Sequence, residues 1–219
     1  MELRLPQEPQ KKQSREASIC AGNLRPSGCG ETVARPAESS RMIFREIKLK
    51  GAFLIEPSRI EDERGFFARA WCQKEFEKHG LVSVLVQSNI SFNKKKGTLR
   101  GLHYQLAPYE EAKLVRCTRG AIHDVILDLR PDSPSYKQWI AATLTAENRE
   151  MLYVPAGCAH GFQTLEDNTE VFYHVSQFFS PEYERGVRWN DPMFAIEWPQ
   201  TELRIVSDKD KAWPYVEHL

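Results

Sequence analysis

Short apolar runs separated by turn residues follow one another along the chain from Met42 onward. The runs are rich in β-branched and aromatic residues, and their lengths suit single strands of a sheet. Gly, Pro, Asn and Asp gather in the segments between the runs, where they favour turns. The clearest runs are VSVLVQSNISF, KLVRCT, AIHDVILDL, KQWIAATL, MLYVP, GFQTL and EVFYHVSQFF. Many short strands at roughly regular spacing predict an all-β sandwich or barrel.

Two short segments depart from the strand pattern and predict helices. The stretch QKEFEKHG ends in a glycine, which is a helix stop signal, and we expect a helix over Cys72–His79. A second short helix is expected near the C-terminus, around Ser207–Trp213.

The first 41 residues form a separate region. They are polar and show no sustained apolar period, and they contain Pro6, Pro9, Pro26 and Pro36. Such a composition favours disorder or a loose arm, and a tail that packs at a specific place is the alternative. We expect residues 1–41 to be a disordered extension and residues 42–219 to be the folded domain.

Charge and hydropathy exclude several classes of protein. The 219 residues include 30 Lys plus Arg and 30 Asp plus Glu, and the zero net charge argues against bulk nucleic-acid binding. A local basic patch for a phosphorylated ligand is still compatible with this balance. No run approaches the roughly 20 apolar residues of a membrane span.

The cysteines and the N-terminus both favour a cytoplasmic protein. The five cysteines are odd in number and widely spaced, with no CxxC pair. This pattern argues against a disulfide framework or a zinc site and favours reduced thiols. The N-terminal stretch MELRLPQEPQKKQSREAS lacks the apolar centre of a secretory signal.

The segment VPAGCAHGF carries a more specific fold signal. Pro155 and Gly157 shape a tight turn, after which His160 can point inward from the next strand. A PxG turn followed by histidine resembles the second motif of the cupins, which are double-sheet jelly rolls. The expected fold is therefore a cupin jelly-roll β-barrel with a few short helices.

The histidine pattern argues against a metal site. A metal-binding cupin supplies HxH and a glutamate in its first motif, whereas the corresponding stretch GLHYQ holds only His103. His103 with the distant His160 is a poor ligand set, because a catalytic metal usually takes three protein ligands. His123 is a further candidate ligand, so a metal-dependent cupin stays an alternative.

Without a metal, the inner residues suit proton transfer. Alone, His103 could be a buried, hydrogen-bonded core histidine, but its near-neutral intrinsic pKa also fits a general base. Arg100 lies three residues earlier, Lys113 opens the next strand, and Tyr173 brings a phenol. A base, a phenolic acid and two cations fit proton abstraction next to a carbonyl, with the cations stabilising the enolate.

From Ile43 to Pro214 the sequence closely resembles the dTDP-4-dehydrorhamnose 3,5-epimerase family. Singly some of the shared motifs are weak, but their order and spacing are highly specific. The motifs are DERGFF, QSN, LRGLHYQ, KLVRC, DVILDLR, SPSYKQW, VPAGCAHGF, RWNDP, IEWP and SDKD.

The resemblance implies a dimeric cupin barrel that needs no metal or cofactor. It implies that His103 is the base that removes the proton α to the C4 ketone, and that Asp210 in SDKD orients this imidazole. Tyr173 corresponds to the acid that returns a proton on the opposite face, and Lys113 to the group near the keto oxygen. The implied reaction converts dTDP-4-dehydro-6-deoxy-D-glucose to dTDP-4-dehydro-L-rhamnose through an enolate.

The resemblance also implies a set of substrate-binding residues. The positions that hold the nucleotide or the sugar correspond to Arg64, Gln87, Asn89, Arg100, His160, Glu184 and Lys209. In this family the DERGFF strand crosses to the partner subunit, which implies a homodimer in which Arg64 and Phe67 complete the neighbour's site. From the residues alone, Arg64 and Glu184 could equally form surface salt bridges.

Two departures from the family pattern fall on the nucleobase side. Arg69 stands where the family usually has a glutamate that meets the thymine, and Phe179 stands where it has a tyrosine. An arginine cannot accept the hydrogen bond from a base N–H that a carboxylate accepts. The reaction type is therefore expected to be intact, with thymidine the leading base and cytidine an alternative.

Three other functions stay open at this point. The first is a mono-epimerase of another deoxysugar pathway, acting on a CDP- or dTDP-linked sugar. The others are a metal-dependent cupin and a protein that binds sugar nucleotides without turnover. The set of His103, Tyr173 and Asp210 argues against pure binding, because binding needs no paired acid and base.

Overall fold

The computed structural model describes residues 41–216. The extension predicted over residues 1–41 lies outside the described residues, apart from Arg41. Of the two units into which the chain divides, Met1–Ala34 and Arg35–Leu219, only the second contains described residues.

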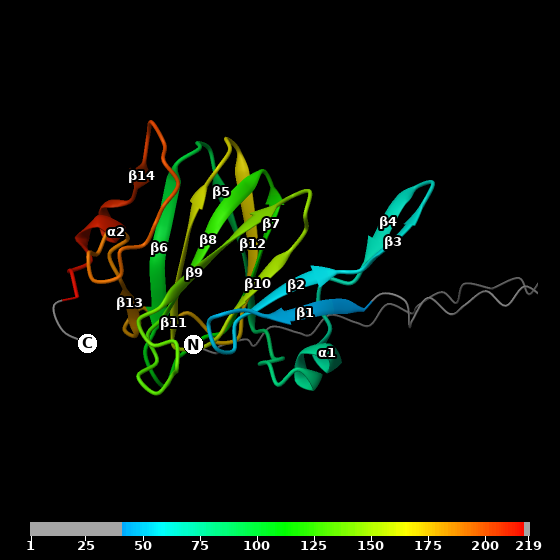
Figure 1. Ribbon diagram of the computed structural model, residues 1–219, viewed down its shortest axis with the longest axis horizontal. Coiled ribbons are helices and arrows are strands. Elements are labelled where there is room, and N and C mark those ends of the chain that lie inside the picture. Colours follow the sequence, from blue (N-terminus) through cyan, green and yellow to red (C-terminus); the bar gives the residue numbers. More distant parts are fainter. Residues whose placement is uncertain (1–40, 217–219) are drawn as a thin grey trace, which may run out of the picture. The chain divides into compact units, whose positions relative to one another are not determined.

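Two β-sheets face each other across the core (Figure 1). Sheet 1 is antiparallel and runs in the order β1 (Met42–Glu46), β2 (Phe53–Pro57), β10 (Met151–Val154), β7 (Lys113–Arg119), β12 (Thr169–Val175) and β5 (Gln87–Asn93). Sheet 2 runs in the order β13 (Glu184–Gly186), β6 (Thr98–Gln105), β11 (Cys158–Thr164), β8 (Ala121–Asp128) and β9 (Trp139–Thr145). A further strand, β14 (Ile205–Val206), pairs with β6 in parallel.

The chain crosses between the sheets at almost every step from β5 to β13. Strands β5, β7, β10 and β12 lie in sheet 1, whereas β6, β8, β11 and β13 lie in sheet 2. This winding is that of a double-sheet jelly roll, and the all-β prediction is confirmed. A separate hairpin of β3 (Arg59–Asp62) and β4 (Gly65–Ala68) projects away from the sheets (Figure 1).

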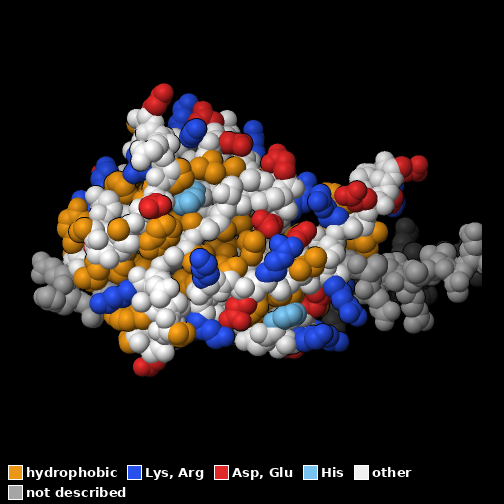
Figure 2. All heavy atoms as spheres, viewed as in Figure 1, with side chains coloured by type: hydrophobic (Ala, Val, Ile, Leu, Met, Phe, Trp, Pro, Cys, Tyr) orange, Lys and Arg blue, Asp and Glu red, His pale blue; other side chains and the backbone are white. Residues whose placement is uncertain are grey.

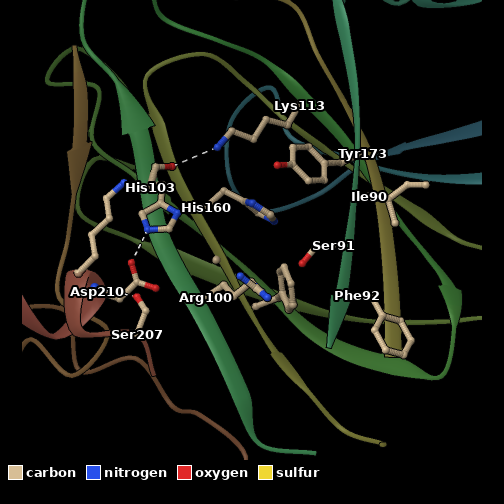
Figure 3. Close-up of a pocket in the computed structure, with 13 residues that line it drawn as sticks. Ile90, Ser91, Phe92, Arg100, His103, Lys113, His160, Tyr173, Ser207 and Asp210 are labelled. Atoms are coloured by element: carbon tan, nitrogen blue, oxygen red, sulfur yellow. Dashed lines mark hydrogen bonds and ion pairs between the residues drawn. The ribbon is translucent and has the colours of Figure 1, made fainter. Parts of the chain in front are cut away.

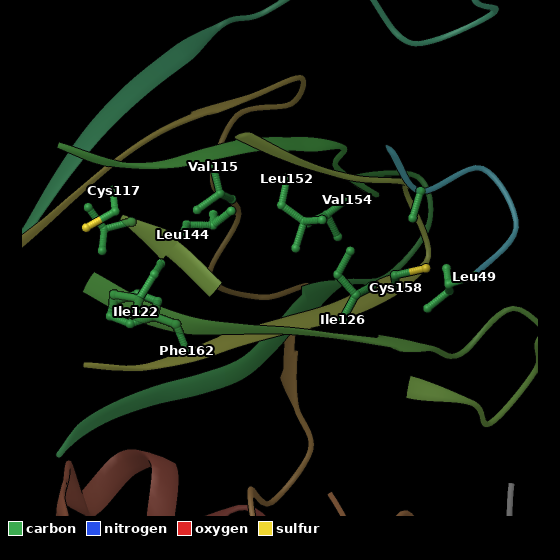
Figure 4. Close-up of a cluster of buried hydrophobic side chains, with 12 residues drawn as sticks. Leu49, Val115, Cys117, Ile122, Ile126, Leu144, Leu152, Val154, Cys158 and Phe162 are labelled. Carbon is green, nitrogen blue, oxygen red and sulfur yellow. The ribbon is translucent and has the colours of Figure 1, made fainter. Parts of the chain in front are cut away.

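The main core fills the space between the sheets, and strand alternation places it there. On β8, Ile122 and Ile126 point inward to this cluster, while Val125 and Leu127 point to the outer face. Successive residues of a strand point to opposite faces, so a strand buried on both sides reads as a continuous apolar run. Figure 4 shows inward side chains of both sheets meeting in this cluster.

The two predicted helices are present and are both short. Helix α1 spans Gln73–Lys78 and buries Phe76 completely against the outer face of sheet 1. Burying a side chain of this size stabilises a fold by about 1.5–3 kcal/mol. Helix α2 spans Asp208–Ala212. Neither helix of the described region is long and apolar enough to cross a membrane.

Acidic and basic side chains are interspersed on the face drawn in Figure 2. Apolar patches lie between them, and no broad basic area covers this face. This distribution agrees with the zero net charge of the chain.

The inner face of β8 also carries a carboxylate, Asp128, which is fully buried at the end of the strand. Arg130 donates to both of its oxygens, at 2.8 and 2.7 Å, and the hydroxyls of Ser133 and Ser135 donate at 2.5 and 2.7 Å. Burial by itself would raise the pKa of Asp128, but these donors outweigh it and lower the pKa to about 2.

We expect Asp128→Asn to lower the free energy of unfolding at pH 7 by about 2 kcal/mol. A depressed pKa in the folded state stabilises the fold above the unfolded pKa, and this contribution disappears as the pH falls toward 2. The difference in the free energy of unfolding between wild type and variant, measured by denaturant titration, should therefore become smaller as the pH falls from 4 to 2. The matched control is Asp132→Asn on the same loop, where the side chain is exposed. A gap that stays constant with pH would contradict this explanation.

Candidate active site

A cavity of about 470 Å³ opens between the two sheets near helix α2 (Figure 3). Strands β6 and β11 of sheet 2 line one side, and β5, β7 and β12 of sheet 1 line the other. Seven of the predicted site residues line this cavity: Arg100, His103, Lys113, His160, Tyr173, Lys209 and Asp210. The fold thus brings together residues that are up to about a hundred positions apart in the chain.

A β-bulge turns Arg100 and His103 to the same side of β6. The two residues are three positions apart, and strict alternation would send them to opposite faces. The register with β11 shifts by one residue here. His160 pairs with His103, and Phe162, two residues on, pairs with Arg100, three residues back. The extra residue in β6 is what lets both side chains enter the cavity.

Two glycines allow the close approach of β6 and β11 at this bulge. Gly101 has a φ of +115°, and a Cβ there would lie 2.6 Å from the Cα of Gly161. A Cβ on Gly161 would lie 2.7 Å from the carbonyl oxygen of Arg100. Any larger residue would push the two strands apart, so glycine at both positions sets the geometry of the cavity wall.

His103 forms a dyad with the carboxylate of Asp210 on α2. The distance from His103 Nε2 to Asp210 Oδ1 is 2.6 Å, and Asp210 is only 3% exposed. The backbone N–H of Gly101 donates to the other carboxylate oxygen at 3.4 Å. Ser207 caps α2 by accepting from the N–H of Asp210.

The charge state of Asp210 decides which nitrogen of His103 carries the proton. Burial acts to raise the pKa of Asp210, but the hydrogen bond and charge of His103 outweigh it, so the pKa is lowered. An ionised carboxylate only accepts, so His103 donates its Nε2–H to Asp210. The other ring nitrogen, Nδ1, then carries the lone pair, and it lies on the cavity side of the ring (Figure 3).

Tyr173 and Lys113 face this dyad from sheet 1. Figure 3 shows the Tyr173 hydroxyl pointing from β12 toward the side of β6. Burial raises the pKa of the Tyr173 phenol, and Glu111 adds to the rise while Arg100 opposes it. The phenol therefore stays protonated at neutral pH and can act as a proton donor.

Lys113 is nearly buried and is paired inside the cavity wall. Its Nζ lies 3.0 Å from Glu111 Oε1 and donates to the backbone oxygen of His103 at 3.3 Å. A buried ammonium without a counter-charge is strongly unfavourable, so Glu111 allows Lys113 to remain charged beside the dyad.

His160 and Arg100 are each oriented by a buried neighbour. His160 Nε2 lies 2.7 Å from Asp124 Oδ1, and Asp124 is fully buried. The Nε of Arg100 donates to Asn93 Oδ1 at 2.8 Å, and Asn93 is 2% exposed. Asn93 fixes one edge of the guanidinium, and the planar group can present its remaining donors to a phosphate.

Comparison with known proteins assigns the family. The profile of the dTDP-4-dehydrorhamnose 3,5-epimerase family matches residues 46–218. The chain belongs to this family. A dTDP-4-dehydrorhamnose 3,5-epimerase from Sinorhizobium fredii is 43% identical over 177 residues, which cover 81% of this chain and 91% of the relative. This family member is therefore an isomerase.

Solved structures of the family have the same fold as this epimerase. The Bacillus anthracis dTDP-4-dehydrorhamnose 3,5-epimerase with TDP and PPi bound has a TM-score of 0.77 and 44% identity, covering 80% of this chain and 100% of that one. The dTDP-6-deoxy-D-glucose-3,5-epimerase of Legionella pneumophila, in complex with dTDP-4-keto-L-rhamnose, has a TM-score of 0.75 and 36% identity over 79% of this chain and 92% of that one.

Five of the predicted binding residues do not line the cavity of this epimerase chain: Arg64, Phe67, Gln87, Asn89 and Glu184. Arg64 and Phe67 lie on the β3–β4 hairpin, and Phe67 is 64% exposed. Gln87 accepts from the backbone N–H of Phe179, and Asn89 pairs with Tyr173 in the sheet. Their predicted roles stay predictions.

Local contacts also hold Arg69 and Phe179, the two residues that depart from the family pattern. Arg69 donates to Glu75 Oε1 of α1 at 2.7 Å, and Glu75 in turn accepts from the N–H of Met42. Arg69 is thus tied to the outer face of sheet 1 in this chain, while Phe179 is more than half exposed. Neither residue lines the cavity.

Three residues around the site escape the sequence analysis: Asn93, Glu111 and Asp124. One of them leaves a signal in the sequence. Asp124 lies between the inward residues Ile122 and Ile126, and a charge at an inner position of an apolar strand demands a partner. The other two matter only through contacts that folding creates.

The metal-free expectation stays a prediction for this epimerase. Within residues 41–216, no group of three or more His, Cys, Asp or Glu side chains is arranged to hold a metal ion. Each of the two cavity histidines bonds a carboxylate of its own, Asp210 or Asp124.

Proposed function

We propose that this protein epimerises dTDP-4-dehydro-6-deoxy-D-glucose at C3 and C5, giving dTDP-4-dehydro-L-rhamnose. One observation carries the proposal. A carboxylate-paired histidine, His103, lies on sheet 2, and a protonated phenol, Tyr173, lies opposite it on sheet 1. Inversion of a carbon next to a ketone needs a base on one face of the sugar and an acid on the other.

In the first step, Nδ1 of His103 takes the proton from C5. The electron pair of the broken C–H bond moves toward the C4 carbonyl and forms an enolate. The ammonium of Lys113 stabilises the negative charge on the enolate oxygen. Asp210 stabilises the imidazolium that forms, because its ionised carboxylate already accepts from Nε2–H.

In the second step, the hydroxyl of Tyr173 donates its proton to C5 from the opposite face. The enolate collapses back to the ketone with inverted configuration. Solvent then takes the proton from the His103 imidazolium and returns a proton to the Tyr173 phenolate. The same base and acid act at C3 after a change in ring conformation. The cycle consumes no oxidant or reductant, which is why the proposal includes no cofactor.

The diphosphate is proposed to bind Arg100, His160 and Lys209. Arg100 is fixed by Asn93 and His160 by Asp124, so both are held in place before a ligand arrives. Anchoring the diphosphate holds the sugar next to His103, and such positioning accounts for much of enzymatic rate enhancement. The relatives crystallised with TDP and with dTDP-4-keto-L-rhamnose favour a thymidine nucleotide.

The proposal includes a homodimer with exchange of the β3–β4 hairpin. Phe66 and Phe67 are 41% and 64% exposed on this hairpin, and a partner subunit would bury them. In that dimer, Arg64 and Phe67 contact the nucleotide of the neighbour, while Gln87, Asn89 and Glu184 contact substrate within their own subunit. A cytoplasmic location also stays a prediction.

The test is hydrogen exchange in heavy water, followed by proton NMR. With dTDP-4-dehydro-6-deoxy-D-glucose we expect solvent deuterium at both C3 and C5 and formation of the L-rhamno product. The CDP-linked sugar is run in parallel to test the base, and a chelator is added to test metal independence. Exchange at one carbon alone would indicate a mono-epimerase. Absence of exchange with either nucleotide, or loss of activity that only added metal restores, would overturn the proposal.

A further inference from the structure

Strand β14 pairs with β6 and holds the segment that carries Asp210 on its N-terminal side. Helix α2 has five residues, and a helix this short is not stable without packing against the rest of the protein. Lys209 of α2 pairs with Glu184 at 2.6 Å, but Lys209 is about half exposed, and exposed ion pairs contribute little. On the C-terminal side of α2, the 2.6 Å contact between Asp210 and His103 therefore needs another anchor.

The ring of Trp213 provides such an anchor by packing on Gly186. A Cβ at Gly186 would lie 2.1, 2.2 and 2.4 Å from three atoms of the indole, far inside any real contact. The φ of Gly186 does not lie in the left-handed region, so its backbone is one that alanine adopts. The missing side chain at Gly186 thus serves the packing of Trp213 and not a backbone turn.

Gly186 is also the strand partner of the proposed base. On β13 it pairs in register with His103 of β6. Trp213 follows Asp210 by three residues, and Asp210 returns to His103 through the dyad hydrogen bond. Strand pairing therefore links His103 to Gly186, packing links Gly186 to Trp213, the chain links Trp213 to Asp210, and the hydrogen bond links Asp210 to His103.

We infer that Trp213, seated on Gly186, is a positioning residue that fixes Asp210 against His103. The inference rests on the proposed function, in which this dyad is the base. The indole nitrogen is buried with no hydrogen-bond partner in the described region, so shape and not a polar bond holds the ring. Arg100 and His160 lie on β6 and β11, so displacement of α2 leaves these two proposed diphosphate contacts in place.

The test compares Gly186→Ala, Trp213→Leu and the double variant in the full-length protein. The added methyl of Gly186→Ala should displace the indole and lower kcat by about 10- to 100-fold, since misplacement of about 1 Å costs up to 10²-fold. KM should change less than kcat, because only Lys209 of the three proposed diphosphate contacts lies on α2. Trp213→Leu removes the ring without adding a clash, so it tests the same contact if Gly186→Ala folds poorly. Lys211→Ala on α2, an exposed residue, is the control and should retain wild-type kcat.

The double variant separates positioning from general damage. If Gly186→Ala acts through the indole, it should lower kcat very little in the Trp213→Leu background. The same loss in both backgrounds would overturn the inference. Asp210→Asn is the reference for the proposed function. If Asp210→Asn is inactive while both single variants keep wild-type kcat, the inference fails and the dyad stands. If Asp210→Asn keeps wild-type kcat, the role of the dyad in the proposed function fails.

Discussion

Replacing His103 by alanine should remove nearly all hydrogen exchange at C3 and C5 while dTDP still binds. Loss of a positioned general base lowers the rate by about 10²–10⁴-fold. Nδ1 of His103 is the proposed proton acceptor, and Lys113, which donates to the backbone oxygen of His103, cannot replace it while its ammonium is paired with Glu111. Arg100 and His160 remain in the variant, so the nucleotide should keep its affinity. Proton NMR in heavy water measures exchange, and calorimetric titration with dTDP measures binding.

The matched control for this variant is His79→Ala. His79 is the C-cap of helix α1. Its ring stacks on the ring of Phe44, with the ring centroids 4.0 Å apart, and its Nδ1 is hydrogen-bonded to the carbonyl oxygen of Glu75. It does not line the cavity. Exchange in the control should match wild type. Undiminished exchange in His103→Ala would eliminate His103 as the base, and loss of dTDP binding would show that the change had damaged the whole site.

Changing Tyr173 to phenylalanine should separate exchange from inversion. His103 can still remove the C5 proton and return solvent deuterium to the same face, so substrate should continue to incorporate deuterium. The opposite face loses its proton donor, and formation of inverted product should fall by about 10²–10⁴-fold. The phenol of Tyr173 suits this role because burial and the charge of Glu111 raise its pKa and keep it protonated.

Tyr104→Phe is the control for the phenol. Tyr104 is the neighbour of His103 on β6, and burial raises its pKa as well, yet its ring packs in the cluster on the outer face of sheet 2. Its loss should leave product formation unchanged. If Tyr173→Phe forms inverted product at the wild-type rate, another group must deliver the proton, and the two-face mechanism would need a different acid.

Local pattern accounts for most of the fold. Each predicted run contains a strand, although VSVLVQSNISF forms one only from Gln87 onward, and QKEFEKHG became α1. Alternation also places Lys113 and Tyr173 correctly. Lys113 shares the inner face of β7 with Val115 and Cys117, and Tyr173 packs against the same inner cluster. Side-chain direction within one strand follows from the backbone geometry of that strand, which is why the sequence is sufficient here.

Residue types alone also indicated the chemistry, but not all of its members. His103, Lys113 and Tyr173 pointed to proton transfer, because imidazole, ammonium and phenol have the required acidities. Asp210 entered only through the family resemblance, since 107 positions separate it from His103. Glu111 and Asn93 had no signal at all. A partner for a buried charge can come from any strand that folding brings alongside.

Strand types, inner faces and the acid–base residue set were thus determined by the sequence itself, because each depends on neighbours within a few positions. The tertiary structure alone decided that Arg100 and His103 share a face, through a bulge that the Gly101–Gly161 approach permits. It also decided that Asp210 reaches His103. Register between distant strands depends on packing across the whole barrel, and no local stretch of sequence encodes it.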